Sequence, residues 1–199
     1  MLGMSLTKLL QHCSAFLAVL LCSCSATGPQ FRPASWPPAR GATVYVFRPD
    51  FQMASAVSPE VYVNGAKAFS LQNNGYGVLA LEAGSHVIEV RYSALSNPCS
   101  GTSFEPVKHT ISVVTGQEYY VRFNLPLPGG KQPRSTFLIA VSPAAMFTPF
   151  GLGAIAEIRA YFDAMCKLPL ELGEIPKEQV FRQIVKTNLV SDGMYSPKR

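Results

Sequence analysis

TVYVFR, residues 43–48, is the stretch that decides the fold. Its residues are β-branched or aromatic at nearly every position, so both faces of an extended strand would be apolar. This pattern is typical of a central strand covered on both sides. Pro49 and Asp50 end the run, because proline cannot donate a backbone hydrogen bond to a neighbouring strand. The sequence therefore predicts a layered β-protein built around residues 43–48.

Turn signals and alternating residues place the other strands on either side of this one. Asn64-Gly65 separates two strand-like runs and is a strong signal for a tight hairpin, since both central residues of such a turn need positive φ. Residues 86–92 alternate cleanly, with His86, Ile88, Val90 and Tyr92 on one face. Further strands are expected at 76–81, 107–114, 119–124 and 136–141, with 107–114 and 119–124 forming a hairpin. We expect a mainly β fold, an antiparallel β-sandwich of about seven or eight strands over residues 42–142.

Residues 143–199 are expected to form a helical extension with one or two α-helices. Apolar residues recur at helical spacing between Leu152 and Met165. A second helix is expected to open at Pro176, with Val180, Phe181, Ile184 and Val185 on its apolar face. The polar tail after Ser191 is expected to fray. The uncharged stretch 135–156 admits a membrane span, although its prolines and glycines favour a buried strand followed by a break.

The start of the chain has the layout of a secretory leader. A basic beginning is followed by an apolar run from about Leu9, which is shorter than a membrane-spanning helix and ends at Leu21-Cys22-Ser23-Cys24. These four residues resemble the lipobox of bacterial lipoproteins. The resemblance implies that residues 1–23 are removed and that Cys24 carries the lipid that attaches the protein to a membrane. Ser25, rather than Asp, after the cysteine implies an outer-membrane location, facing the periplasm or the cell surface.

Residues 24–41 are rich in Pro, Ser, Ala and Gly, which predicts an extended, lipidated tether between membrane and domain. Trp36 within it is expected to pack on the edge of the domain, with an anchor at the lipid headgroups as the alternative. Two thiols remain after loss of the leader and lipidation, Cys99 and Cys166. In an oxidising compartment they are expected to form a disulfide, and two separate buried thiols are the alternative.

Three segments together resemble a known family. They are Ala42 to Pro49, Val61-Tyr62-Val63-Asn64-Gly65, and the strand from Gly84 to Val90 with its His86, Ile88 and Glu89. They resemble the DUF2846 domain of predicted bacterial lipoproteins, over roughly residues 41–141. The resemblance implies a small β-sandwich related to transthyretin-like and PEGA-like modules. It implies no biochemical activity.

No catalytic constellation is evident in the sequence. His86 and His109 both fall within strand patterns and are interpreted as structural histidines. Neither Cys99 nor Cys166 has a further ligand at metal-binding spacing, so we expect no metal and no cofactor. Gly151-Leu152-Gly153 lacks the lysine of a phosphate-binding loop and is interpreted as a hinge or a site of close packing. A net charge of +5 without a Lys/Arg cluster predicts no nucleic-acid partner.

These features predict a non-enzymatic, lipid-anchored envelope protein whose sandwich binds another envelope protein or a glycan. A more specific version is a structural subunit of an envelope-spanning secretion machine, comparable to the lipid-anchored subunit of type VI secretion. A third hypothesis, from another class, is a small-ligand binder or hydrolase with a pocket between sandwich and helices. A shared polar cluster around His86 and His109 would favour this third hypothesis, and two separate histidines would oppose it.

Overall fold

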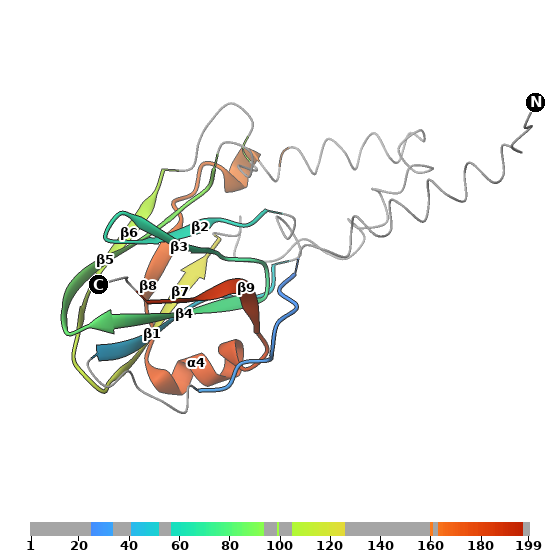
Figure 1. Ribbon diagram of the computed structural model, residues 1–199. Coiled ribbons are helices and arrows are strands. Elements are labelled where there is room, and N and C mark those ends of the chain that lie inside the picture. Colours follow the sequence, from blue (N-terminus) through green and yellow to red (C-terminus); the bar gives the residue numbers. More distant parts are fainter. Residues whose placement is uncertain are drawn as a thin grey trace, which may run out of the picture.

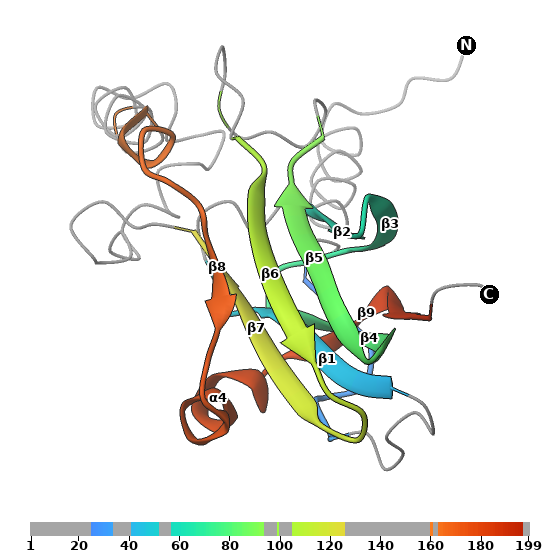
Figure 2. The same cartoon turned by 90° about the vertical axis from the view of Figure 1, so that its left-hand side faces the viewer.

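The computed structural model describes residues 25–33, 41–51, 57–93, 99, 105–125, 160 and 163–196. They form two packed β-sheets with a helix on the outer face of one sheet (Figures 1 and 2). The elements are β1 (Gly41–Arg48), β2 (Glu60–Val63), β3 (Ala66–Ser70), β4 (Gly75–Glu82), β5 (Gly84–Arg91), β6 (Val107–Val113), β7 (Glu118–Asn124), β8 (Glu171–Glu174), α4 (Lys177–Ile184) and β9 (Asn188–Tyr195). The predicted β-sandwich is confirmed.

One sheet has five strands in the order β8-β7-β1-β4-β9, and the other has four in the order β3-β2-β5-β6. The four-stranded sheet is antiparallel throughout, as expected. The five-stranded sheet is mixed, because β1 runs parallel to β7 and β4 runs parallel to β9. Both parallel neighbours are reached by long connections, through the other sheet for β7 and through α4 for β9, and parallel pairing requires such crossovers.

β1 is the central strand of the five-stranded sheet, and every one of its residues is buried. Alternate side chains point in opposite directions along a strand. Val44 and Val46 therefore enter the core between the sheets, while Tyr45 and Phe47 pack on the other side, in a cluster with Val180 and Ile184 of α4. The prediction that residues 43–48 are covered on both faces is confirmed.

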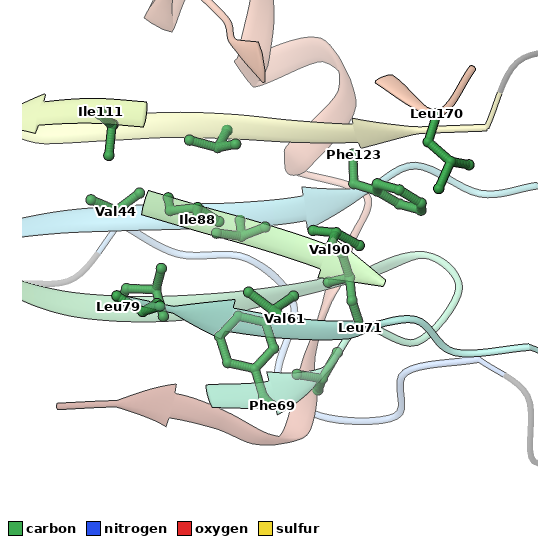
Figure 3. Close-up of a cluster of buried hydrophobic side chains, with 14 of the residues drawn as sticks. Val44, Val61, Phe69, Leu71, Leu79, Ile88, Val90, Ile111, Phe123 and Leu170 are labelled. Carbon is green, nitrogen blue, oxygen red and sulfur yellow. The ribbon is translucent and has the colours of Figure 1, made fainter. Parts of the chain in front are cut away.

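The core between the sheets is aliphatic with a few phenyl rings. Figure 3 shows Val44, Leu79 and Phe123 of the five-stranded sheet facing Val61, Ile88 and Ile111 of the other. The hairpin at Asn64-Gly65 is also confirmed, with φ of 51° and 84° at its two central residues. Positive φ at both positions matches the twist that joins β2 to β3.

The expected hairpin between residues 107–114 and 119–124 is wrong. β6 and β7 belong to different sheets, so residues 114–117 cross from one sheet to the other. Two backbone hydrogen bonds fix this crossing on β1. Thr43 N donates to Gln117 O at 3.0 Å, and Gly116 N donates to Gly41 O at 2.8 Å. The turn is thus bonded to β1, and β6 and β7 do not pair with each other.

The extension after residue 142 is not only helical. α4 begins after Pro176, as predicted, and buries Val180 and Ile184. However, β8 and β9 are strands that complete the two edges of the five-stranded sheet, and β9 includes part of the tail expected to fray. Phe181 and Val185, expected on the apolar face, are 36% exposed. Trp36, Gly151 to Gly153, the strand expected at 136–141 and most of the helix expected at 152–165 lie outside the described residues.

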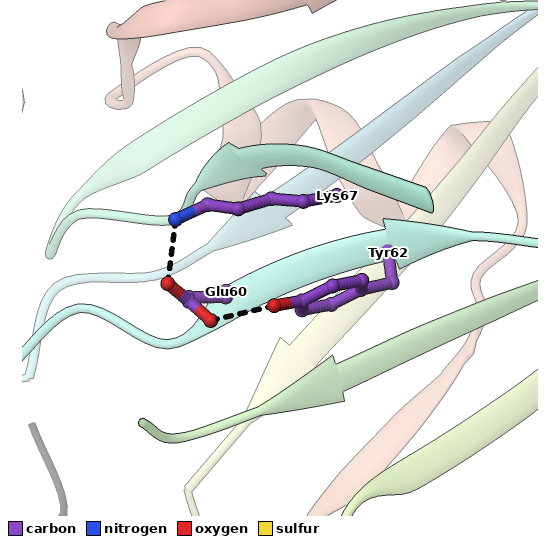
Figure 4. A network of polar contacts seen from close by, with 3 residues as sticks. All are labelled: Glu60, Tyr62 and Lys67. Atoms are coloured by element: carbon purple, nitrogen blue, oxygen red, sulfur yellow. Dashed lines mark hydrogen bonds and ion pairs between the residues drawn. The ribbon is translucent and has the colours of Figure 1, made fainter. Parts of the chain in front are cut away.

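The outer face of the four-stranded sheet carries a polar network. Glu60 accepts hydrogen bonds from Lys67 and from the hydroxyl of Tyr62 (Figure 4). These bonds lower the pKa of the Glu60 carboxyl below its usual value. The guanidinium of Arg91 lies 3.6 Å from the centroid of the Tyr62 ring, on the same sheet face. These cross-strand contacts join β2 to β3 and to β5 on the outer face.

Candidate anchoring site at the amino-terminal strap

Residues 25–33 form a strap that is bonded to the folded domain. The described residues begin at Ser25, so the predicted lipidation residue Cys24 lies outside them. The predicted tether is wrong for this segment: in Figure 1 the blue chain runs beside β9 and on toward α4. Isolated β-bridges pair Ser25 with Asn73 and Gln30 with Asn188.

Backbone hydrogen bonds hold the strap at four of its residues. Ala26 N donates to Asn73 O at 3.1 Å, Gly28 N to Leu189 O at 3.2 Å, and Phe31 N to Thr187 O at 2.9 Å. In return, Leu189 N donates to Pro29 O at 2.9 Å. Side chains add to this ladder, since Asn188 Nδ2 donates to Ala26 O and Gln30 Nε2 donates to Val185 O. The proline-rich composition does not prevent this pairing, because the proline carbonyl still accepts.

Gly28 lets the strap lie close to the start of β9. A Cβ at this position would be 2.3 Å from the carbonyl oxygen of Leu189. Real Cβ atoms do not approach a backbone oxygen so closely, so any other residue would push the strap away. Gly28 precedes Pro29 in the sequence, and the composition around this pair predicts a linker.

Phe31 anchors the strap in a second apolar cluster. Its ring meets Tyr45 and Tyr76 edge to face, with centroids 5.2 Å apart in both pairs, and Tyr45 stacks on Tyr120. Phe31 is 6% exposed. Burial raises the pKa of Tyr76, and burial together with the carboxylate of Glu118 raises the pKa of Tyr120 well above its ordinary range. The cluster therefore holds Tyr76 and Tyr120 in the neutral form.

Asn73 joins the strap to the end of β1. Its side-chain Oδ1 accepts from Phe51 N at 2.9 Å, and its Nδ2 donates to Asp50 Oδ1 at 2.6 Å. Its backbone carbonyl accepts from Ala26, and the residue is 2% exposed. Sequence pattern gives no sign of this role for Asn73, because its partners Ala26, Asp50 and Phe51 are far away in the sequence.

A buried cation lies at the same end of the sandwich. Arg48 is fully buried and donates from Nη1 to Val57 O at 2.6 Å. Burial lowers the pKa of Arg48, and the charges of Tyr92 and Asp50 act against that shift. Burial also raises the pKa of Tyr92 from 10.0 to about 12, which the charge of Arg48 opposes. Desolvation is the larger effect on both groups.

The structure links Cys99 and Cys166 by a disulfide, with the two Cα atoms 5.8 Å apart. Cys99 is buried at the edge of the main core, and Cys166 packs against that core. The bond attaches the segment before β8 to the segment between β5 and β6. A separation of 67 residues makes it a long-range link.

The two histidines of the sheets have different partners. His86 Nε2 is 2.9 Å from Glu82 O and its Nδ1 is 3.0 Å from Asn64 Nδ2. Asn64 Oδ1 accepts from Val87 N, so the amide nitrogen faces the ring, and a neutral imidazole satisfies both bonds. His109 Nε2 instead lies 3.2 Å from Glu174 Oε1 of β8. The two rings share no partner in the described part of the chain, and each one joins neighbouring elements.

Of two surface hollows, one is lined by residues 105–107 and 166–170, ahead of β6 and β8, and the other lies where β6, β7 and β8 meet. Their volumes are about 390 and 340 Å³, and they share Val107 and Leu170. Arg122, Glu171 and Glu174 line the second hollow. Among the described residues, no group of three or more His, Cys, Asp or Glu side chains is placed to hold a metal ion. Within the same residues, no helix has the length and apolar character needed to cross a membrane.

The fold is a two-sheet β-sandwich with a docked strap at its amino-terminal side. Residues 38–133 match the model of the family described as "Protein of unknown function (DUF2846)", so the chain contains a DUF2846 domain. A search of the curated proteins finds no match. The matched region supplies β1 to β7, whereas the strap, β8, α4 and β9 lie outside it. All of these additions attach to the five-stranded sheet or its edges.

Proposed function

We propose that this protein is a lipid-anchored cell-envelope protein, attached through Cys24, whose β-sandwich is a non-enzymatic binding or structural module. The observation that carries the proposal is the Leu21-Cys22-Ser23-Cys24 pattern, which ends one residue before the strap. A leader removed before Cys24 would leave a chain that is bonded to the domain almost from its first residue.

The outer membrane is the proposed location, with the domain facing the periplasm or the cell surface. Ser25 after the cysteine supports it through the resemblance to lipoproteins. The Cys99–Cys166 disulfide supports an oxidising compartment, where such bonds persist.

The separate partners of His86 and His109 support a non-enzymatic role over the hydrolase hypothesis. A general base needs a nucleophile within hydrogen-bond reach and a group that orients it. Both ring nitrogens of His86 are instead hydrogen-bonded, one to Glu82 O at the turn between β4 and β5 and the other to Asn64. The proposed partner is another envelope protein or a glycan, held by the surface of the sandwich.

A structural role in an envelope-spanning machine is the second candidate. The observation that favours it is the set of additions outside residues 38–133, which enlarge the five-stranded sheet. Co-purification with one defined secretion subunit would favour this candidate over a general binding module.

The proposal is tested by membrane fractionation of cells that carry the native protein, a Cys24→Ala variant or a Cys22→Ala variant. Cys22→Ala is the matched control, because it removes a neighbouring thiol and leaves the residue proposed to carry lipid. We expect the native and Cys22→Ala proteins in the outer-membrane fraction. Cys24→Ala should retain its leader and leave that fraction, as should native protein in cells treated with globomycin. Equal distribution of all three proteins would refute the proposal.

A further inference from the structure

The strap begins at one defined end of the sandwich. Ser25 is bridged to Asn73, two residues before β4 starts at Gly75, and Gly75 is paired with Arg48 at the end of β1. We call this the strap end. The end of β5 lies there too, because the ring of Tyr92, one residue after β5, packs against Phe123, next to Arg122, which pairs with Phe47 of β1. β6 starts at the same end, since its Val107 pairs with Val90 of β5.

The chain has reached the opposite end of the sandwich by Gly41. β1 starts there, and Gly41 pairs with Glu82 at the far end of the sheet. The two ends of this strand of 8 residues are about 23 Å apart, at about 3.3 Å per residue. The strap, residues 25–33, is bonded to Asn73, Thr187 and Leu189 and therefore does not serve as a spacer between domain and membrane.

The connection between Cys24 and the folded domain is correspondingly short. Ala26 is 3% exposed, and its backbone N–H is bonded to Asn73. Consecutive Cα atoms are about 3.8 Å apart, so the Cα of Cys24 lies within about 8 Å of that of Ala26. A lipid on Cys24 would thus emerge directly from the strap end.

We infer that the domain stands on the bilayer with the strap end toward the lipid surface and the far end pointing away from it. The inference rests on the proposed function, since it requires lipid on Cys24. The far end then presents the turns at Glu82 to Gly84 and at residues 114–117 to other envelope components. The strap end therefore faces the membrane into which the protein's own acyl chains insert.

Residues Glu105 and Thr115 provide a direct test, because both are exposed and they lie just outside the two ends of β6. Acylated full-length protein would carry an azide amino acid at one of these positions, coupled to a donor fluorophore. Energy transfer to acceptor lipids in vesicles then measures the distance of each position from the bilayer. We expect residue 105 to lie about 20 to 30 Å nearer to the bilayer than residue 115, the length of β6.

Gly28→Val is the variant that should abolish this difference, because its side chain collides with the carbonyl of Leu189 and releases the strap. Thr27→Val, at an exposed neighbouring position, is its matched control and should keep the difference. Acylated native protein with equal distances for residues 105 and 115, or with residue 115 nearer, would overturn the orientation and leave the anchor intact. An intact mass without acyl chains on Cys24 would overturn the anchor and the orientation together.

Discussion

Phe31 meets Tyr45 edge to face, with the ring centroids 5.2 Å apart and the ring planes at 78°. The contact joins a residue of the proline-rich amino-terminal segment to the central strand of the five-stranded sheet. Because β1 is covered by α4 and by the strap on the side away from the main core, the strap is part of the structure that buries this strand. The anchor region and the fold are therefore not independent.

Phe31→Ala should destabilise the domain by about 3 kcal/mol, the usual cost of removing a buried phenyl ring. Chemical denaturation of residues 25–199, with the disulfide intact, measures this change. Arg32→Ala is the control, because that side chain is exposed and the substitution should cost less than about 0.5 kcal/mol. Equal stability of the two variants would show that the strap does not contribute to the core.

Gly28→Val should release the strap without unfolding both sheets. The backbone N–H groups of Ala26, Gly28 and Phe31 are bonded in the docked strap and are expected to exchange slowly with deuterium. In the variant their exchange should be at least about tenfold faster, while amides of β5 stay protected. Unchanged exchange at these three amides would mean that the close approach to Leu189 is not needed.

Asn73→Asp should destabilise the domain at neutral pH, because it places a second carboxylate at the position that now donates to Asp50. The repulsion raises the pKa of one of the two carboxyl groups, and its protonation as the pH falls relieves the repulsion. The stability difference from the native protein should therefore shrink as the pH falls from neutral. Asn73→Ala, which leaves Phe51 N without its acceptor, should cost about 1 to 3 kcal/mol and show no such recovery.

Stability should fall between pH 10 and 12 in part because of Tyr92. Its pKa is raised from 10.0 to about 12 in the folded protein, so its contribution is complete below pH 10 and is lost as the pH rises toward 12. Tyr92→Phe removes the ionisable group and should flatten this part of the stability curve. Denaturation midpoints measured between pH 9 and 12 test the point, and parallel curves for both proteins would contradict it.

Replacing both Cys99 and Cys166 by alanine should lower the free energy of unfolding by about 4 kcal/mol. This value follows from the loop entropy of a link across 67 residues. Denaturation of the oxidised native protein and of the double variant measures the difference. A loss below about 1 kcal/mol would mean that the bond constrains a region already separate from the cooperative unit.

Local sequence chemistry was sufficient to predict the central strand and the first hairpin. Residues 43–48 are apolar on both faces, and Asn64-Gly65 admits the positive φ of a tight hairpin, so β1, β2 and β3 follow from their own residues. His86 is interpreted from its strand pattern as a structural histidine, and its bond to Glu82 O in the turn before that strand agrees with this interpretation.

The edges of the five-stranded sheet were not predictable in the same way. β8 consists of Glu-Leu-Gly-Glu, and β9 contains Ser191, Asp192 and Gly193, so neither has a strand pattern. Both are strands because β7 and β4 offer them unpaired backbone groups. The docking of the strap was not predictable for the same reason. Gly28 and Pro29 are typical of a linker, and the residues that hold the strap, Asn73 and Leu189, are far away in the sequence.

The most direct test of the central claim is the intact mass of the full-length protein purified from membranes, with fragmentation of its amino-terminal peptide. The account predicts a mature chain that begins at Cys24 and carries a diacylglycerol on its sulfur and a further acyl chain on its amine. A chain that retains residues 1–23, or that begins at an unmodified Cys24, would contradict the claim that this protein is held on a membrane by lipid.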